Sequence, residues 1–600
     1  MITCKSQESS PTATSTQIRI FSVAMNVSDR VSHAPVEPLQ EPYTSLVGAA
    51  NDHINPSSNL VPSQPEKVEK SAYPTSPVHS TTEVVSEQLR TSPPVEWARN
   101  RLVSPIHRLP EEVLSSIFMT IIFSFDHPDT PDSTLMEQDV YEIYRRVYGL
   151  LRVCSAWRRV IMTRAVFWSV VPMVESSSTR EPRPSELSLQ RAGGSKLHLV
   201  AVANLNSPNI SKGLIEVITK YNYRFDAVSL SIGDHRILVD AINGLLSGEN
   251  NSQSLAKLSV RYIAASDNLS RLPSDDSYVF RHDDPRQEKF VELVGALTAF
   301  RINGVHFRWQ TMAFSARLTE LWIENITLGH DSAIVPFLQA ASSASQLRVL
   351  KIITVDTFCR RDPLINFPTI PSLIAFPNLQ SLYIRDLYWN TLKSLFRMIA
   401  PGPYHLTLFF RETSLRNNFD KQDFNPFEVQ YTGFGKINVD ELSEYLGRIP
   451  VHTLMLSEHS ARGQLTGRTL RVLLKAMPAL KTLKMHRWEF NESVCSGLKR
   501  PQGKQAARQE CLFPALERLQ LSAATILSNE GFQEMVASYS LQQVTLGATI
   551  KTDTSGNKKR PLEEEDDLAK WLGDNVPYFR LVEDRYCPPE FQSVRWEFKC

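Results

Sequence analysis

A hydrophobic pattern with the spacing L-x-x-L-x-L recurs along the chain and constrains the fold more than any other feature. Ten copies begin at Phe225, Leu255, Leu297, Leu318, Leu347, Leu379, Val451, Leu480, Leu516 and Leu541. Most are 21 to 36 residues apart, and a degenerate copy at His405 falls within the longest gap. Self-similarity at this period is the signature of a repeat protein, in which each unit buries its apolar face against its neighbours.

Each copy predicts a short strand, because its fourth and sixth positions are apolar and turn to the same side. Between copies the apolar spacing becomes helical. The clearest examples at i, i+3, i+4 and i+7 are Leu470, Leu473, Leu474, Met477 and Phe532, Met535, Val536, Tyr539. Alternating strands and helices predict an α/β solenoid over residues 187–550.

The pattern resembles the leucine-rich-repeat family, whose units continue as L-x-x-L-x-L-x-x-N/C. The position usually held by Asn or Cys is apolar in five copies, as Ile326, Val355, Leu387, Trp488 and Ala524. A side-chain hydrogen-bond ladder is therefore not available there, and we expect irregular repeats with unequal helices. The alternative is a helical-repeat or ordinary α/β domain whose strands share this spacing.

Residues 104–173 predict a small all-α module. Pro110 suits the first turn of a helix, and Glu111 and Glu112 complement its N-terminus. The apolar stripe of this helix is Val113, Leu114, Ile117, Phe118 and Ile121. A second helical face is predicted from Leu150, Val153, Cys154, Trp157, Val160 and Ile161. Helices this short bury little apolar area alone, so we expect a partner.

The module resembles the F-box through Leu109-Pro110-x-Glu112-Val113-Leu114-x-x-Ile117-Phe118, Val153-Cys154-x-x-Trp157-Arg158-x-Val160 and Phe167-Trp168. Members of that family bind the Skp adaptor, which links them to a cullin-RING ubiquitin ligase, while a downstream repeat domain captures a protein substrate. The resemblance implies that this chain is such a substrate receptor. It implies an adaptor-binding surface of Leu109, Pro110, Val113, Leu114, Ile117, Val153, Cys154 and Trp157.

The spacing between the two halves of this motif is longer than usual in the family by about fifteen to twenty residues, so we place an inserted loop at 124–147. Such an extended loop is similar to that of F-box-like sequences, many of them fungal. Two alternatives stay open. The helices could form a small core without an adaptor, or they could cap the N-terminal end of a leucine-rich-repeat scaffold that joins no ligase.

The remaining segments have distinct compositions. Residues 1–100 contain 11 Pro, 16 Ser and 9 Thr, which predicts a disordered arm because too little apolar surface is available to offset conformational entropy. Residues 551–570 carry a basic run followed by an acidic run and predict a solvated loop. Residues 571–600 are rich in aromatic side chains and predict a C-terminal cap on the solenoid.

Charge, apolar run length and cysteine usage limit the kinds of partner and the cellular compartment that we expect. A formal net charge of +1 provides no overall field for nucleic acid, and the longest apolar run, Ile117 to Phe125, is too short to span a bilayer. We therefore expect neither a nucleic acid nor a membrane partner. Seven widely spaced cysteines without a C-x-x-C pair favour a reducing compartment, in the cytoplasm, the nucleus or both.

The sequence offers no constellation for catalysis. Gly433-x-Gly435-Lys436 lacks the first glycine of a phosphate loop, and Ile437 stands where Ser or Thr should follow. No zinc-ligand spacing occurs, so we expect a non-enzymatic chain without a metal or cofactor. Substrate contacts are predicted on the concave strand face, at Trp322, Tyr383, Arg348 and Lys484, with the two aromatics as exposed anchors. The alternatives are ordinary solvated strand residues or an enzyme with a deep polar pocket.

Overall fold

A computed structural model describes residues 105–124, 135–174, 184–204, 208–247, 254–263, 272–359, 373–419, 439–457, 465–501, 513–551 and 559–592. The predicted arm 1–100 lies outside these residues. Within them the chain forms one 16-stranded sheet, in which nearly every strand pairs with the next in sequence. All pairs are parallel except the pairing of β14 with β15. This is an α/β, solenoid-like fold.

The strands are β1 Val170–Val174, β2 Leu197–Ala203, β3 Phe225–Ile232, β4 Lys257–Tyr262, β5 Ala299–Asn303, β6 Glu320–His330, β7 Val349–Phe358, β8 Ser381–Arg385, β9 His405–Phe410, β10 Val451–Ser457, β11 Thr482–His486, β12 Glu489–Phe490, β13 Arg518–Ile526, β14 Gln543–Lys551, β15 Lys559–Pro561 and β16 Tyr578–Leu581. The repeat helices are α8 Pro184–Arg191, α9 Pro208–Tyr221, α10 His235–Leu246, α11 Arg286–Ala296, α12 Ile334–Ser342, α13 Trp389–Met398, α15 Val439–Gly447, α16 Gly467–Ala476, α17 Glu492–Leu498, α19 Asn529–Ala537 and α20 Asp567–Asn575.

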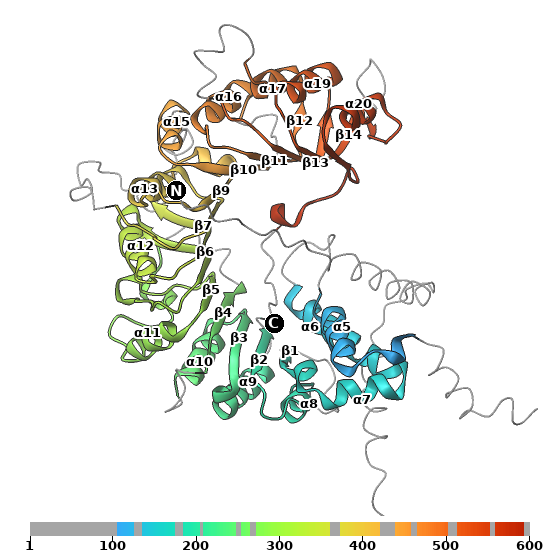
Figure 1. Cartoon of the computed structure of the whole chain (residues 1–600). Coiled ribbons are helices and arrows are strands. Elements are labelled where there is room, and N and C mark those ends of the chain that lie inside the picture. The colour runs from blue at the N-terminus through green and yellow to red at the C-terminus, as the bar shows by residue number, and fades with distance from the viewer. Residues whose placement is uncertain are drawn as a thin grey trace, which may run out of the picture. The chain divides into compact units, whose positions relative to one another are not determined.

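The predicted repeats are confirmed as strand units. All ten copies form strands, and the degenerate copy at His405 forms β9. In each of the ten copies the first, fourth and sixth side chains are at most 5% exposed. The two clearest helical stripes form α16 and α19. Helices cover the outer side of the curved sheet, and the opposite side, here called the inner strand face, carries the third, fifth and seventh side chains of each copy (Figure 1).

A residue in the left-handed conformation follows the seventh position in five copies. The eighth residues Asn325, Thr354, Asp386, Arg487 and Ala523 have φ between 47° and 57°. This conformation costs about 1 kcal/mol or more for a residue with a Cβ, so packing must hold it. The ninth side chains follow it into the core and are 1% exposed, namely Ile326, Val355, Leu387, Trp488 and Ala524. Apolar packing thus occupies the position that was predicted to lack a hydrogen-bond ladder.

Three predicted boundaries are wrong. The sheet begins at Val170 rather than at 187. The prediction missed β1 because β1 and β2 are nearly continuous apolar runs without the repeat spacing. The inserted loop predicted at 124–147 ends early, since residues Leu135–Val153 form helix α6. The loop predicted at 551–570 contains β15 and the start of α20, because Arg560 in the basic run pairs with Asp566 in the acidic run at 2.8 Å.

The N-terminal helical module consists of α5 Glu111–Phe123, α6 Leu135–Val153 and α7 Ser155–Thr163. It packs on the first repeat. The Tyr144 hydroxyl on α6 donates a hydrogen bond to the Val170 carbonyl on β1 at 2.8 Å and contacts the Ser188 hydroxyl. Arg191 lies over the Trp168 ring at 5.1 Å. One hydrophobic core therefore continues from the module into the sheet.

The C-terminal residues divide between two places. Strand β16 pairs with β14 at the end of the sheet, next to α20. Residues 587–592 instead lie over the inner strand face, where they contact β8, β9 and β11. No helix in the described ranges combines the length and apolar character needed to cross a membrane.

Candidate functional site

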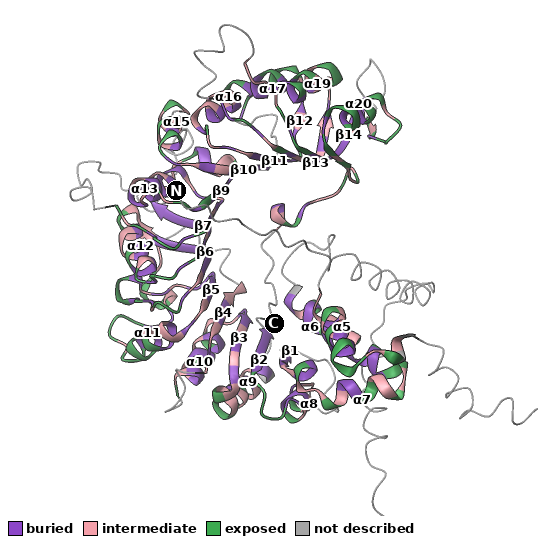
Figure 2. Cartoon of the chain, in the orientation of Figure 1, coloured by how far each residue is buried: buried purple, intermediate pink, exposed green. Residues whose placement is uncertain are grey.

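The structure separates the eight predicted adaptor-binding residues by exposure. Pro110 is exposed, and Val113 and Val153 are 39% and 57% exposed. Leu114 is only 6% exposed and belongs to the core of the module. The remaining four, Leu109, Ile117, Cys154 and Trp157, are half-buried. Figure 2 shows the exposed residues along α5 and α7.

Helices α5 and α7 are held together by an aromatic pair and two surface ion pairs. The ring of Trp157 lies 4.7 Å from that of the fully buried Phe118. Glu111 pairs with Arg159 at 3.3 Å and Glu112 with Arg164 at 3.1 Å. A backbone hydrogen bond, together with Arg164, lowers the pKa of the Glu112 carboxyl. The packing fixes which side of the helix pair remains open.

The predicted second helix is broken, which is a correction to its assumed apolar face. Cys154 has an extended backbone (φ −161°), and its Sγ accepts a hydrogen bond from the Trp157 amide at 3.5 Å. It caps α7 instead of lying within a helical stripe. Helix α6 ends at Val153, and that side chain is exposed rather than part of the core that its helical spacing predicted.

Exposed large apolar side chains concentrate in this module. Among the described residues there are seven, and four of them lie between residues 113 and 166, namely Val113, Tyr141, Val153 and Val166. Scattered exposed apolar residues are ordinary, but a small module that holds most of them offers contact area for another protein.

On the inner strand face, the expectation that Trp322 is exposed is wrong. Trp322 on β6 is 5% exposed. Arg301 and Lys351, at the same register on β5 and β7, lie over its ring at 5.1 and 4.1 Å. Arg301 also pairs with Glu320 at 2.8 Å. These two cations interact with the face of the indole and also cover it from solvent.

Tyr383 and Lys484 come together in a cluster on the same face. Tyr383 is half-buried against Phe409, Met455 and Phe591, and burial raises the pKa of its hydroxyl to about 12. Lys484 forms an ion pair with Glu590. Both predicted substrate residues are therefore in contact with the chain's own C-terminal residues. Tyr383 is half-buried, so the expectation that it is an exposed anchor is also wrong.

The cluster contains residues that the sequence prediction missed. Phe591 packs edge-on against Phe409 at 5.4 Å and stacks on His486 at 5.2 Å. Arg385 on β8 donates hydrogen bonds to the carbonyls of Gln592 at 2.7 Å and Glu590 at 3.4 Å. Arg385 and His486 are the seventh residues of their copies, one position beyond the six that define the pattern.

Arg348 lies apart from this cluster. It is exposed and directly precedes β7, where its carbonyl accepts hydrogen bonds from the Gln380 and Ser381 amides. Three of the four predicted substrate residues thus lie on strands of the inner face, while Arg348 marks the edge where β7 begins.

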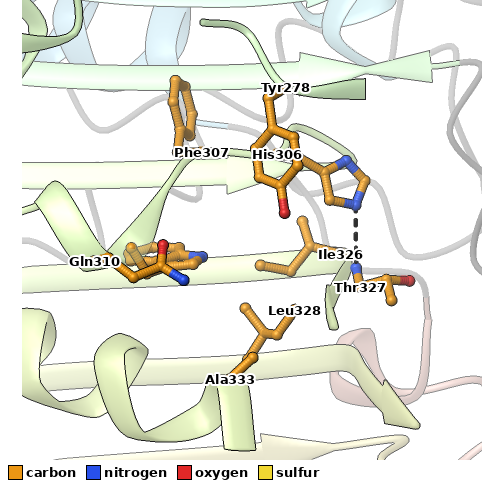
Figure 3. Close-up of a pocket in the computed structure, with 9 residues that line it drawn as sticks. Tyr278, His306, Phe307, Gln310, Ile326, Thr327, Leu328 and Ala333 are labelled. Carbon is orange, nitrogen blue, oxygen red and sulfur yellow. Dashed lines mark hydrogen bonds between the residues drawn. The ribbon is translucent and has the colours of Figure 1, made fainter. Parts of the chain in front are cut away.

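A small pocket lies beside β6 (Figure 3). Tyr278 and His306 line one side, and Ile326 and Leu328 the other. His306 Nε2 accepts a hydrogen bond from the Thr327 amide at 3.3 Å, and burial lowers the pKa of its imidazole to about 4. His306 is therefore neutral at physiological pH and serves to link β6 to the preceding loop.

Within the described part of the chain, no three His, Cys, Asp or Glu side chains are grouped so that they could hold a metal ion. Compared with known proteins, the sequence matches no family model, and no curated protein matches it significantly. The two surfaces described above are therefore the basis for a functional proposal.

Proposed function

We propose that this chain is the substrate-recognition subunit of a Skp-cullin-F-box type ubiquitin ligase. In this role the helical module binds the Skp adaptor and the repeat sheet binds a protein substrate. The chain itself performs no chemistry and acts by holding a substrate lysine near the charged conjugating enzyme, which raises its effective concentration. Such a subunit works in the cytoplasm or the nucleus.

The observation that carries the proposal is the exposure of Val113 and Val153. Both belong to the motif that resembles the F-box, and both are large apolar side chains left open to solvent. Pro110, from the same motif, is exposed beside the start of α5. Large apolar side chains that are left open to solvent favour association with another protein.

A second candidate function is a repeat scaffold whose helical module only caps the sheet. The hydrogen bond from Tyr144 to Val170 and the shared hydrophobic core favour it. A cap needs its buried face alone, so the two candidates differ in what they require of the exposed valines.

The test is co-purification of the full chain with a recombinant Skp adaptor, comparing wild type with Val113→Asp and Val153→Asp. Each substitution places a charge on a surface that an adaptor would desolvate, and we expect binding to fall by about 100-fold, as for an interface hot spot worth about 3 kcal/mol. Tyr141→Asp is the matched control, because Tyr141 is exposed in the same module but lies outside the motif.

Thermal melting checks that the variants remain folded, which Leu114→Asp would not allow because Leu114 is buried. Adaptor binding that is lost in both valine variants and kept in Tyr141→Asp supports the ligase subunit. A folded wild-type chain that binds no adaptor leaves the scaffold as the function.

A further inference from the structure

A turn near the C-terminal end of the described chain covers a group of side chains on the inner strand face, here called the pocket. Residues Pro589–Phe591 form a single 3-10 turn, closed by a hydrogen bond from the Phe591 amide to the Pro588 carbonyl at 2.9 Å. The turn presents two side chains to the sheet. Glu590 pairs with Lys484, and Phe591 is 5% exposed.

The walls of this pocket come from four neighbouring strands. Arg385 lies on β8, Phe409 on β9, Met455 on β10 and both Lys484 and His486 on β11. Phe409 and Met455 form a hydrophobic cluster with Phe591 that is distinct from the main core. The pocket is thus built on a rigid sheet, and withdrawal of Phe591 would leave its apolar floor facing solvent.

The pocket distinguishes three parts of its occupant. The cation of Lys484 selects an acidic side chain, and the space between Phe409 and His486 accepts an aromatic ring. Arg385 binds main-chain carbonyls, so it recognises the path of the turn rather than its side chains. Arg385 and Arg411 also lie over the Phe409 ring, at 4.7 and 5.5 Å, and Asp386 pairs with both arginines at 3.2 Å.

We infer that this pocket is a binding site for a protein segment that forms a proline-preceded turn with an acidic residue followed by an aromatic one. The chain's own Pro589-Glu590-Phe591 turn occupies the site until such a partner displaces it. Proline before the turn limits the conformations of a free segment and so lowers the entropy cost of binding. The inference deepens the proposed function, on which it rests, by giving the class of substrate segment.

Competition within one chain has a measurable consequence. The tethered turn is present at a high effective concentration, so only a fraction of the molecules have an open pocket. The apparent affinity for a partner is the intrinsic affinity multiplied by that fraction. Release of the tethered turn should therefore strengthen binding of a free peptide without any new contact. To release the turn we use a variant with Phe591→Ala and Phe598→Ala, here called the relieved variant. Phe598 is included because the sequence repeats the Glu-Phe pair at Glu597-Phe598.

The experiment measures fluorescence anisotropy of a labelled peptide with the sequence of residues 586–592 and Ser in place of Cys587. We expect the full-length relieved variant to bind it about tenfold more tightly than wild type. Lys484→Glu in the relieved background should weaken binding by about tenfold. The matched control is Lys481→Glu. This substitution makes the same charge change, but Lys481 pairs with Glu517 rather than with the turn.

Two peptide controls define specificity. A peptide with Ala in place of the phenylalanine, and one with Lys in place of the glutamate, should each lose most of the affinity. Equal binding of either one by the relieved variant would overturn the inference, as would a folded relieved variant that binds no better than wild type. Dimers formed by exchange of the C-terminal turn would also overturn it, because the occupant would then be a second copy.

If the relieved variant does not fold, Glu590→Lys replaces it. The Glu590 side chain is 40% exposed, so the substitution spares the core while it repels Lys484. Peptide binding should again rise relative to wild type, and an unchanged affinity would refute the inference. No adaptor is present in these measurements, so a failure of the ligase proposal and a failure of this site are distinguishable.

Discussion

Lys484 on β11 and Glu590 in the C-terminal turn form an ion pair although 106 positions separate them in sequence. The side chains are 19% and 40% exposed, so solvent screens the pair and its contribution is about 1 kcal/mol or less. Its consequence is mainly positional. Together with the hydrogen bonds from Arg385 and the burial of Phe591, it holds the turn on the inner strand face.

Charge reversal at this pair should loosen the turn, and Cys587 reports it. Cys587 is half-buried at the start of the turn, 3.7 Å from His486 Nε2, and burial raises the pKa of its thiol. Loss of about 1 kcal/mol in Glu590→Lys should increase the detached population by about fivefold. The measurement is the maleimide labelling rate of Cys587, resolved from the other cysteines by peptide mass mapping.

The double variant Lys484→Glu with Glu590→Lys restores opposite charges and should return the labelling rate toward that of wild type. Such rescue distinguishes the ion pair from general loosening of the fold. A labelling rate in Glu590→Lys equal to that of wild type would mean that the pair does not hold the turn.

The strands were predictable wherever the core is filled by residues four and six of a copy. Leu321 and Ile323 on β6 have that spacing and are fully buried. The strands β1 and β2 were missed because Val171 and Leu199 lie in nearly continuous apolar runs, which do not distinguish a buried strand from a helix. The break at Cys154 was missed because helical spacing alone cannot show which residue caps the next helix.

The candidate sites were less predictable than the fold. Lys484 and Tyr383 were identified because they alternate with the core residues of their strands and must therefore lie on the inner strand face. Their contact with the C-terminal turn was not predictable, because no local sequence pattern indicates that the turn carrying Phe591 packs on these strands. The burial of Trp322 was not predictable, because the residues beside it on β5 and β7 are the cations Arg301 and Lys351 rather than apolar side chains. These cations cover the ring, and the register of the strands decides which residues lie beside it.

Phe118 and Trp157 should differ in their contribution to the stability of the module. Phe118 is fully buried between helices, so Phe118→Ala should cost about 3 to 5 kcal/mol through lost burial and a cavity. Trp157 is half-buried, so Trp157→Ala should cost less, about 2 kcal/mol. Urea denaturation of the full chain, followed by far-ultraviolet circular dichroism, measures both. A larger loss for Trp157→Ala would contradict the packing described here.

Glu324 on β6 should make the protein less stable as pH rises. Burial raises its pKa from 4.5 to about 7, although Arg261, Arg385 and Lys351 oppose the shift. Between these values the folded state binds the proton and the unfolded state does not, so the free energy of unfolding decreases with increasing pH. Below pH 4.5 both states are protonated and the penalty is absent, whereas above pH 7 it is complete.

The matching variant is Glu324→Gln, which cannot ionise. Relative to wild type it should gain stability between pH 4.5 and pH 7, by up to about 3 kcal/mol, and the difference should be constant outside that window. Burial also raises the pKa of Asp356 to about 7, but Asp356 is present in both proteins and cancels in the comparison. A difference in unfolding free energy that does not change with pH would exclude Glu324 as its source.

The close approach of α16 and α17 depends on two glycines. A Cβ at Gly497 would lie 2.1 Å from the Gly467 carbonyl oxygen, and one at Gly467 would lie 2.0 Å from the Ser493 carbonyl oxygen. Because these neighbours are backbone atoms, Gly497→Ala must push the helices apart and should cost about 1 to 3 kcal/mol. Gly573→Ala in α20 is the matched control, since a Cβ there meets nothing within 4 Å. The control should gain about 0.5 to 1 kcal/mol from its helix propensity, and equal effects at the two sites in guanidinium denaturation would show that the helices do not pack this closely.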